Sequence, residues 1–510
     1  MKITKDQIMR FFSIHLIEVI FLCVSLMLGY YVFSLKLNMD DNVHIFPSVL
    51  HKYLEHFVGY TRDYGLLRPL ALVFFYIIYS IYLVSPAIAH LVPFAAQVIS
   101  GYLIYSLLRK RLDIRVSMLL GLLYIVFPFF IEQYGWLAAS NATLANLTLI
   151  LMLHIVEMNR IRLNKKVMFI TILQSIGVLL YENVFFTGIA VAYILSRSEK
   201  FEVRTWKFIK SFLVINLPSL LYFITRTFIL KPHAPSFARE MSGSRILTED
   251  GMLHVISNIR SLFETLSYIF TAEGVRNEYW IKNFAQGLEI LSSSWLLVSL
   301  LNLLIFFFAV FFISQKGYKI YSDEPKQDTD WISDVKIWLI ISFLSFLPAL
   351  LLSMIAFPFR VIALPIYFII VGLVILITKY SKNISLAIVL ILVIFSFASS
   401  VNILNQNKLV SQDDELSYIK IVESIERKRP GNNKVELIIK DMPNSSRTSF
   451  VFGQYLASCV SSDWCLQAAL NRRTDRISKI TVNPTEVLFT SPQAIIFKYN
   501  PQNNSVDLIE

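Results

Sequence analysis

Residues 361–378 read VIALPIYFIIVGLVILIT, a run of eighteen residues without one charged side chain. As an α-helix this run would be about 27 Å long, close to the thickness of the hydrocarbon core of a bilayer. Uninterrupted apolar runs of this length predict transmembrane helices. Arg360 precedes the run and Lys379 follows it, so charged residues flank the apolar segment on both sides.

The composition of the whole chain extends this interpretation from one segment to the fold class. Of the 510 residues, 55% are hydrophobic and 16% are charged, and the mean hydropathy is +0.58. Soluble domains carry about 25% charged residues, and disordered chains have low hydrophobicity. The composition excludes both classes and predicts a polytopic α-helical membrane protein surrounded by membrane lipid.

Apolar runs recur along the chain and predict eleven membrane spans. They lie near residues 11–35, 86–108, 115–131, 137–157, 166–181, 183–196, 206–229, 291–314, 335–357, 361–378 and 384–402. The first run is too long for the apolar region of a signal peptide, so we expect it to be an anchor. The fifth and sixth spans are expected to form a tight hairpin around Tyr181-Glu182-Asn183.

A further apolar run, Leu66 to Val84, is assigned from the distribution of basic residues. If this run crossed the bilayer, the basic stretch Arg109 to Arg115 would lie on the side opposite to the basic N-terminus. If it lies at the outer interface, six cytoplasmic segments hold 22 of the 47 basic residues, and the short outer loops hold only Arg360. This second arrangement follows the positive-inside rule. It places the net charge of +11 at the inner membrane surface and removes nucleic acid as a partner.

Three large segments then lie outside the cytoplasm. They are the first outer loop at 36–85, which contains the interfacial helix, a long loop at 230–290, and the C-terminal tail at 403–510. Residues 1–402 form the predicted transmembrane domain.

The tail is polar and differs in character from the rest of the chain. Its apolar spacing predicts a helix over Asp413 to Arg427, and strands at Val435 to Ile439 and Ala494 to Tyr499. We therefore expect a small extracytoplasmic α/β domain. Cys459 and Cys465 lie in this tail, either as a disulfide or as two reduced cysteines.

Two adjacent carboxylates follow the first span, in Leu37-Asn38-Met39-Asp40-Asp41-Asn42. They are either a solvated start of the loop or part of a functional site. Downstream, Arg62-Asp63-Tyr64-Gly65-Leu66-Leu67-Arg68-Pro69-Leu70 leads into the interfacial helix, and the next span ends in Arg109-Lys110-Arg111. This order resembles the start of the membrane-embedded GT-C glycosyltransferases, and among them the Gtr-type glucosyltransferases that modify O-antigen. The resemblance covers the first 160 residues by motif and the eleven spans by layout.

The resemblance implies a reaction and a place for it. A sugar hydroxyl is a poor nucleophile, so a general base must activate it. That role falls to Asp40, while Asp41 orients the acceptor or Asp40 itself. The donor would be a sugar linked to a polyprenyl phosphate such as undecaprenyl phosphate, and the acceptor lipopolysaccharide or another surface glycan. The enzyme would act by inverting single displacement in a bacterial inner membrane, with a cytoplasmic N-terminus and a periplasmic C-terminus.

The leaving phosphate of such a donor needs fixed cations. The outer-side candidates are Arg62, Arg68 and Arg360, with Arg226 near the outer end of the seventh span as a further one. Arg360 stands alone in a short loop, where interfacial snorkelling is the other interpretation. No motif demands a metal or another cofactor, although the carboxylate pair could hold a divalent ion in some members of the superfamily.

Two short outer loops add polar and aromatic candidates. Glu132, Tyr134 and Trp136 lie in one of them, and their rings would either stack on a sugar or anchor the helices in an aromatic belt. Glu182 lies in the other loop, where it would bind acceptor hydroxyls or cap a helix end.

Two other function classes remain open on the sequence. An O-antigen polymerase or ligase would also have many spans and large outer loops, although the soluble tail and the early acidic pair argue against it. A lipid-linked sugar flippase or transporter would move its cargo without forming a glycosidic bond. The small number of charged residues within the spans argues against a transporter.

Overall fold

A computed structural model describes part of the chain. The described residues are 5–36, 55, 68–200, 205–230, 256–257, 259–260, 263–264, 267, 281–293, 298–305, 332–351, 359–431, 434–441, 463–471, 473–474, 476–482, 494–500 and 505–509. All structural statements below concern these residues.

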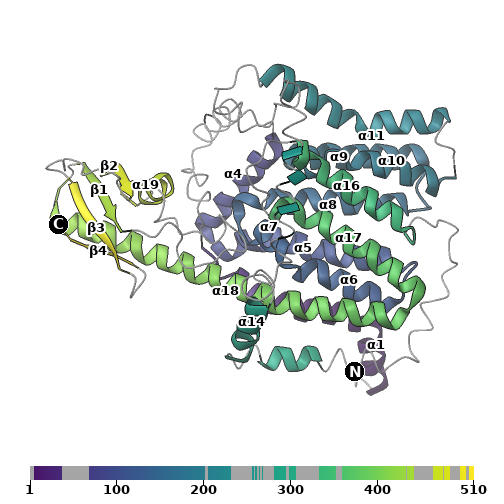
Figure 1. The fold of residues 1–510 in the computed structure, drawn as a ribbon, viewed down its shortest axis with the longest axis horizontal. Helices are drawn as coiled ribbons and strands as arrows, with labels where there is room; N and C mark the ends of the chain where they lie inside the picture. Colours follow the sequence, from purple (N-terminus) through teal and green to yellow (C-terminus); the bar gives the residue numbers. More distant parts are fainter. Residues whose placement is uncertain are drawn as a thin grey trace.

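The described chain is mostly helical, with one small sheet at its C-terminal end (Figure 1). In order, the helices are α1 (Lys5–Val32), α4 (Pro69–Val84), α5 (Pro86–Leu108), α6 (Ile114–Val126), η1 (Pro128–Phe130), α7 (Ile131–Gly135), η2 (Leu137–Ala139), α8 (Asn141–Val156), α9 (Leu163–Leu180), η3 (Glu182–Val184), α10 (Thr187–Ser198), α11 (Trp206–Ile224), η4 (Thr225–Leu230), α14 (Ile281–Ser293), α16 (Val335–Leu351), α17 (Phe359–Tyr380), α18 (Lys382–Lys428) and α19 (Asp463–Asn471). The strands are β1 (Val435–Lys440), β2 (Ile477–Val482), β3 (Ala494–Asn500) and β4 (Ser505–Leu508).

Several helices are long and apolar enough to cross a bilayer, as a polytopic membrane protein requires. Six described helices meet this criterion, or up to eight if each of two bent helix pairs is one span. One bent pair joins α6 to η1 and α7 at a 40° break, near the end of the single run predicted at 115–131. The number of eleven crossings stays a prediction.

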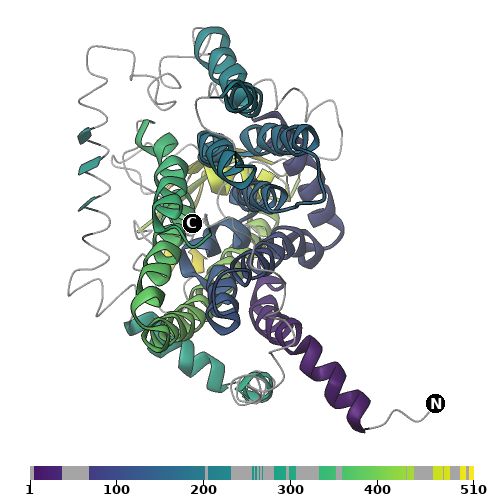
Figure 2. The same ribbon diagram turned by 90° about the vertical axis from the view of Figure 1, so that its right-hand side faces the viewer.

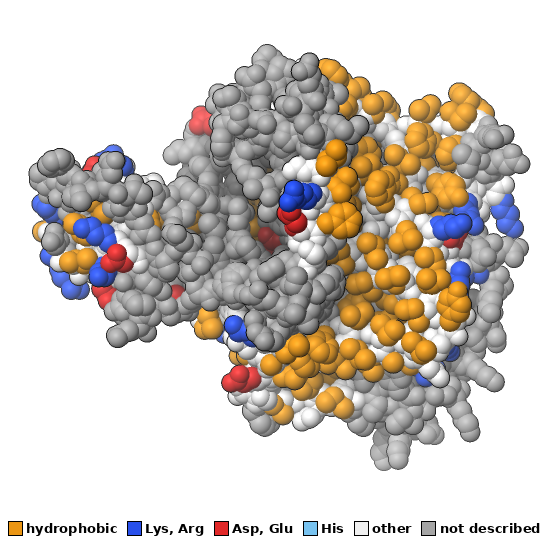
Figure 3. Space-filling view, viewed as in Figure 1, with side chains coloured by type: hydrophobic (Ala, Val, Ile, Leu, Met, Phe, Trp, Pro, Cys, Tyr) orange, Lys and Arg blue, Asp and Glu red, His pale blue; other side chains and the backbone are white. Residues whose placement is uncertain are grey.

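The face of the helix bundle seen in Figure 3 is largely apolar, as expected for contact with lipid. In Figure 3, hydrophobic side chains cover the face of the bundle, and the charged side chains gather toward its ends. Inside the bundle, α5 and α6 approach closely at Gly101 and Gly121. A Cβ atom at either position would lie 2.6 Å from the other residue's carbonyl oxygen, so only glycine permits this contact.

One end of the bundle is closed by ion pairs between the predicted cytoplasmic loops. Each pair joins a nitrogen of Lys or Arg to a carboxylate oxygen of another loop. The pairs are Lys110 with Glu157 (3.7 Å), Lys166 with Glu199 (2.5 Å), Arg197 with Asp334 (2.6 Å), and Lys382 with Asp113. Loops that are far apart in the sequence therefore meet at one end of the bundle, which we call the basic end.

The N-terminal helix begins on the side of the basic end. Phe33, just after α1, contacts Phe94 of α5, with 6.0 Å between ring centroids, whereas Phe21 contacts Tyr105 at 5.9 Å. The two helices are thus antiparallel, and the start of α1 points toward the basic loop that follows α5. Figure 2 shows the N-terminus at the free end of α1. Lys36, which follows α1, lies toward the opposite end of the bundle.

Helix α4 is the predicted interfacial segment. Its 16 residues correspond to about 24 Å of helix, which is shorter than the hydrocarbon core of a bilayer. It packs against α5 and α9, and in Figure 1 it is inclined to the bundle helices at the end opposite the basic end. Its placement at the membrane surface stays a prediction.

Helix α18 joins the bundle to the C-terminal sheet as one element of 47 residues. The predicted helices at 384–402 and 413–427 are both parts of it. The predicted strands at 435–439 and 494–499 are confirmed as β1 and β3. The sheet order is β2-β1-β3-β4, with β1 parallel to β2 and β3 and with β4 antiparallel to β3.

A second apolar core lies between the sheet and its helices. Ile421 and Ile425 of α18 are buried there with Leu466 and Leu470 of α19. Cys465 of α19 is disulfide-bonded. Cys459 lies outside the described residues.

Candidate functional site

The site is built around the short turn between α9 and α10, where the sequence predicted a hairpin. Helix α9 ends at Leu180, and the turn η3 begins at Glu182. Gln174 donates to the carbonyl oxygens of Val184 and Phe185 at 3.0 and 3.1 Å, and Asn141 of α8 donates to the carbonyl oxygen of Leu180 at 2.9 Å. Side-chain amides therefore bind the backbone on both sides of Glu182.

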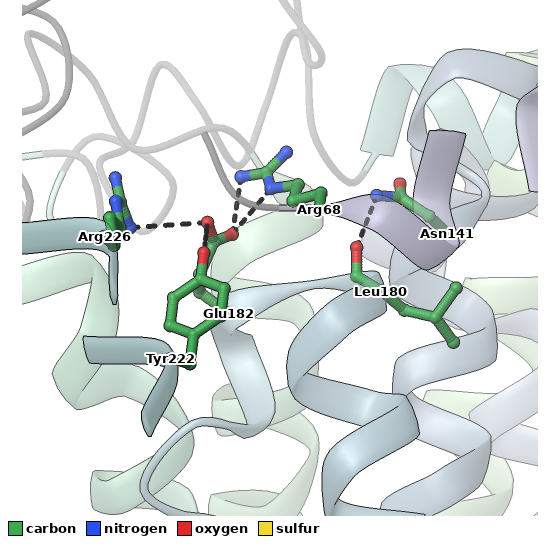
Figure 4. A network of polar contacts seen from close by, with 6 residues as sticks. All are labelled: Arg68, Asn141, Leu180, Glu182, Tyr222 and Arg226. Carbon is green, nitrogen blue, oxygen red and sulfur yellow. Dashed lines mark hydrogen bonds and ion pairs between the residues drawn. The ribbon is translucent and has the colours of Figure 1, made fainter. Parts of the chain in front are cut away.

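Glu182 holds two arginines from distant elements (Figure 4). Its Oε2 accepts from Arg68 Nε at 2.9 Å and lies 2.5 Å from Arg68 Nη2. Its Oε1 accepts from the Tyr222 hydroxyl at 2.7 Å and from Arg226 Nη1 at 3.4 Å. We call these four residues the Glu182 cluster. Both carboxylate oxygens of Glu182 are engaged by protein donors.

Local sequence explains how each arginine reaches the carboxylate. Arg68 precedes Pro69, the first residue of α4, and its backbone is not helical (φ −121°, ψ 60°). A residue before proline avoids the helical region, so Arg68 projects away from the helix that follows. Its guanidinium also lies over the Tyr181 ring, 4.7 Å from the centroid. Arg226 lies in the π-helix η4, four residues after Tyr222, so both reach the same carboxylate oxygen.

The electrostatics of the Glu182 cluster favour a charged carboxylate in a sheltered site. The side chain of Glu182 is 6% exposed, and those of Arg68 and Arg226 are 20% and 14% exposed. Burial alone raises the pKa of Glu182, but the two guanidinium groups and the hydrogen bonds from Arg68 and Tyr222 outweigh it and lower the pKa to about 2. The four residues carry two positive charges and one negative charge.

The Glu182 cluster lies at the end of the bundle opposite the basic end. Asn141 at the start of α8 bonds to Leu180, next to the Glu182 cluster. Glu157, directly after the other end of α8, pairs with Lys110 of the basic end. The two ends of α8 thus mark the two ends of the bundle.

The structure brings together two of the predicted site residues, Arg68 and Glu182. Asp40, Asp41 and Arg62 lie outside the described residues. Arg360 is the second residue of α17, and its side chain is not among the described ones. The predicted roles of these last four residues stay predictions.

The predicted aromatic loop is packed inside the bundle. Glu132, Tyr134 and Trp136 are 1%, 0% and 2% exposed. The Tyr134 ring lies 5.6 Å from that of Phe94. Contact of these three residues with a sugar stays a prediction.

Sequence reasoning missed Tyr222 and named Arg226 only as a further candidate. The signal was a tyrosine and an arginine four residues apart at the outer end of a predicted span, a spacing that places both on one helix face. Among the described residues, no group of three or more His, Cys, Asp or Glu side chains is placed to hold a metal ion.

No protein-family model matches the chain, and no curated protein matches it. Among solved structures, the chain is similar to the crystal structure of ArnT from Cupriavidus metallidurans in the apo state. The sequence identity is 12%, the TM-score is 0.36, and the match covers 95% of this chain and 93% of that chain. These values do not establish a shared family or activity.

Proposed function

We propose that the chain is a GT-C-type membrane glycosyltransferase that moves a sugar, glucose in the first instance, from a polyprenyl-phosphate donor to a surface glycan such as O-antigen. The observation that carries this proposal is the Glu182 cluster, in which two arginines are held at the end of the bundle opposite the basic end. The sequence resemblance at 37–42 and 62–70 supports the same reaction.

The Glu182 cluster suits a lipid phosphate. Arginine binds phosphate oxygens through two parallel hydrogen bonds, and a sheltered site strengthens this interaction. Arg68 and Arg226 would bind the phosphate, and Glu182 would hold their guanidinium groups in place before the donor arrives. Fixed cations of this kind stabilise the charge that develops on the leaving phosphate.

Asp40 is the proposed general base. Lys36, after the end of α1, lies toward the same end of the bundle as the Glu182 cluster, and Asp40 follows it by four residues. Four residues span at most about 14 Å, so the proposal puts Asp40 near this end. The acceptor hydroxyl oxygen would attack the anomeric carbon while its proton passes to Asp40. The bond from that carbon to the phosphate oxygen would break, and its electron pair would stay on the phosphate.

The remaining predicted residues complete the proposal. Asp41 would orient the acceptor or Asp40, and Arg62 and Arg360 would add cations near the phosphate. Glu132, Tyr134 and Trp136 would contribute to sugar binding. The enzyme would lie in a bacterial inner membrane with its basic end in the cytoplasm and its C-terminal sheet in the periplasm.

The experiment is sugar analysis of the surface polysaccharide from cells with and without this protein. Transfer of a monosaccharide changes the composition of the polysaccharide and leaves its chain length unchanged. A change in chain length alone would indicate a polymerase instead. Transport of the lipid-linked sugar without a new glycosidic bond would indicate a flippase.

A further inference from the structure

A chain of buried side-chain amides leads from the Glu182 cluster into the bundle. Asn183, next to Glu182, donates from Nδ2 to Oδ1 of Asn146 in α8. Asn146 in turn donates from Nδ2 to Oε1 of Gln133 in α7, at 2.8 Å. All three amide side chains belong to buried residues, at 4%, 0% and 0% exposure.

Asn146 is the middle member of this chain, and both halves of its amide are used. It accepts one hydrogen bond and donates another, so it joins the η3 turn to α7 through a single side chain. Removing it would leave the Asn183 donor and the Gln133 acceptor buried without this partner. A buried polar group that loses its hydrogen-bond partner destabilises the arrangement that buries it.

Neighbouring residues of α8 hold the same two turns. Asn141 donates to the carbonyl oxygen of Leu180, just before the η3 turn, and Thr143 donates to the carbonyl oxygen of Gln133 at 3.0 Å. The first turns of α8 therefore fix the positions of η3 and α7 relative to each other, and the side chain of Asn146 bonds to both of them.

We propose that Asn146 is a positioning residue that holds the η3 turn, and with it Glu182, at the place where Arg68 and Arg226 converge. This inference rests on the proposed function, because it concerns the site that would bind the donor phosphate. Asn146 touches no substrate in this proposal. It acts through Asn183 on Glu182, and through Glu182 on the two guanidinium groups.

The test measures binding of decaprenyl phosphate to the purified full-length chain in lipid nanodiscs. Asn146→Leu removes both hydrogen bonds with little change in volume. Thr148→Val is the matched control, because Thr148 lies on the same helix, is also buried, and bonds only to the carbonyl oxygen of Ala145 among the hydrogen bonds described. We expect the Asn146→Leu variant to raise Kd at least tenfold and the Thr148→Val variant to change it less than twofold.

A double-mutant cycle separates positioning from general loss of structure. In an Arg68→Gln background one of the two oriented guanidinium groups is absent and only Arg226 remains, so Asn146→Leu should raise Kd by a smaller factor, less than threefold further. If Asn146→Leu does not insert and fold, Asn183→Ala breaks the same chain from its other end and is expected to give the same result.

Each outcome decides between the two proposals. If the wild-type chain does not bind decaprenyl phosphate, the proposed function and this inference both fall. If the wild-type chain binds it and Asn146→Leu stays within twofold of Thr148→Val, only the positioning role falls. An effect of Asn146→Leu that is equally large in the Arg68→Gln background would also overturn the positioning role.

Discussion

Arg68 Nη2 lies 2.5 Å from Glu182 Oε2, although the two residues are 114 positions apart in the chain. The contact joins the start of α4 to the turn between α9 and α10. A buried carboxylate that pairs with two guanidinium groups is costly to disrupt from one side only, because the remaining charges stay buried without a counter-ion. The Glu182 cluster therefore links α4 to the turn between α9 and α10, and it is also a candidate anion-binding site.

The acidic pair gives the first prediction. Asp40→Asn should lower sugar transfer by a factor on the order of 10² to 10⁴, because the amide cannot accept the proton of the acceptor hydroxyl. Transfer is measured by sugar analysis of the surface polysaccharide, and membrane insertion by the amount of protein in the membrane fraction. Asp328→Asn, in the loop between the predicted spans at 291–314 and 335–357, which is expected to be cytoplasmic, is the control and should leave transfer unchanged. Full transfer by Asp40→Asn would refute the assignment of the base.

Arg68 gives the second prediction. Arg68→Lys keeps the positive charge but loses the planar, two-pronged donor group and its stacking on Tyr181, so kcat/KM for transfer should fall about 10- to 100-fold. Arg115→Lys, at the basic end, is the matched control and should change kcat/KM less than about twofold. Equal kinetics for the two variants would count against a phosphate at the Glu182 cluster.

Glu182 gives a prediction of pH dependence. Its pKa is lowered from an ordinary value of 4.5 to about 2 in the folded chain, so its ion pairs contribute stability above pH 4.5 that is lost as the pH falls toward 2. Glu182→Gln lacks this contribution at every pH. The Tm of the wild-type chain should exceed that of the variant at about pH 7, and the gap should narrow at about pH 3. A Tm difference between the wild-type chain and Glu182→Gln that stays constant from about pH 7 to pH 3 would contradict the charged, ion-paired state of Glu182.

The crossing of α14 and α18 gives a prediction of stability. A Cβ atom at Gly287 would meet the backbone carbonyl of Ala398 directly, so Gly287→Ala must push the two helices apart. It should lower stability by about 1–3 kcal/mol, seen as a lower Tm of the purified chain. Gly372→Ala is the control, because its nearest neighbour would lie 3.5 Å from the new Cβ.

Sidedness gives the last prediction. Asn38→Cys should react with a membrane-impermeant maleimide in intact cells, after the outer membrane is made permeable. Arg111→Cys should react only when the inner membrane is also opened, and the wild-type chain gives the background from its own cysteines. If Arg111→Cys reacted in cells with an intact inner membrane and Asn38→Cys did not, the acidic pair would lie in the cytoplasm. A surface glycan could not reach the proposed site there.

The sequence predicted the components of the site better than their arrangement. Arg68 and Glu182 were both candidates, but their pairing depends on how α4 packs against α9, and nothing local in the sequence specifies a contact over 114 positions. The burial of Tyr134 and Trp136 was missed for a similar reason. Their segment looked like a short outer loop, whereas α6 ends before Pro128, the axis bends there by 40°, and the residues that follow are packed inside the bundle.

The change in composition after residue 402 concealed the continuity of α18. Residues 382–428 contain no glycine and no proline. The first proline and the first glycine after them are adjacent, at Pro430-Gly431. The polar composition after residue 402 suggested a domain boundary there. The polarity of a segment indicates whether water or lipid surrounds the helix. Glycine and proline indicate where the helix can end.

The length of α18 sets the geometry of everything attached to it. Its 47 residues make a rod of about 70 Å, of which the bilayer takes up roughly 30 Å. Because the helix is uninterrupted, it holds the C-terminal sheet at a fixed distance from the bundle. A tilt of about 5° at the membrane would move the end of the roughly 40 Å outside the bilayer by about 3 Å, so the position of the sheet would follow the tilt of the bundle in the lipid.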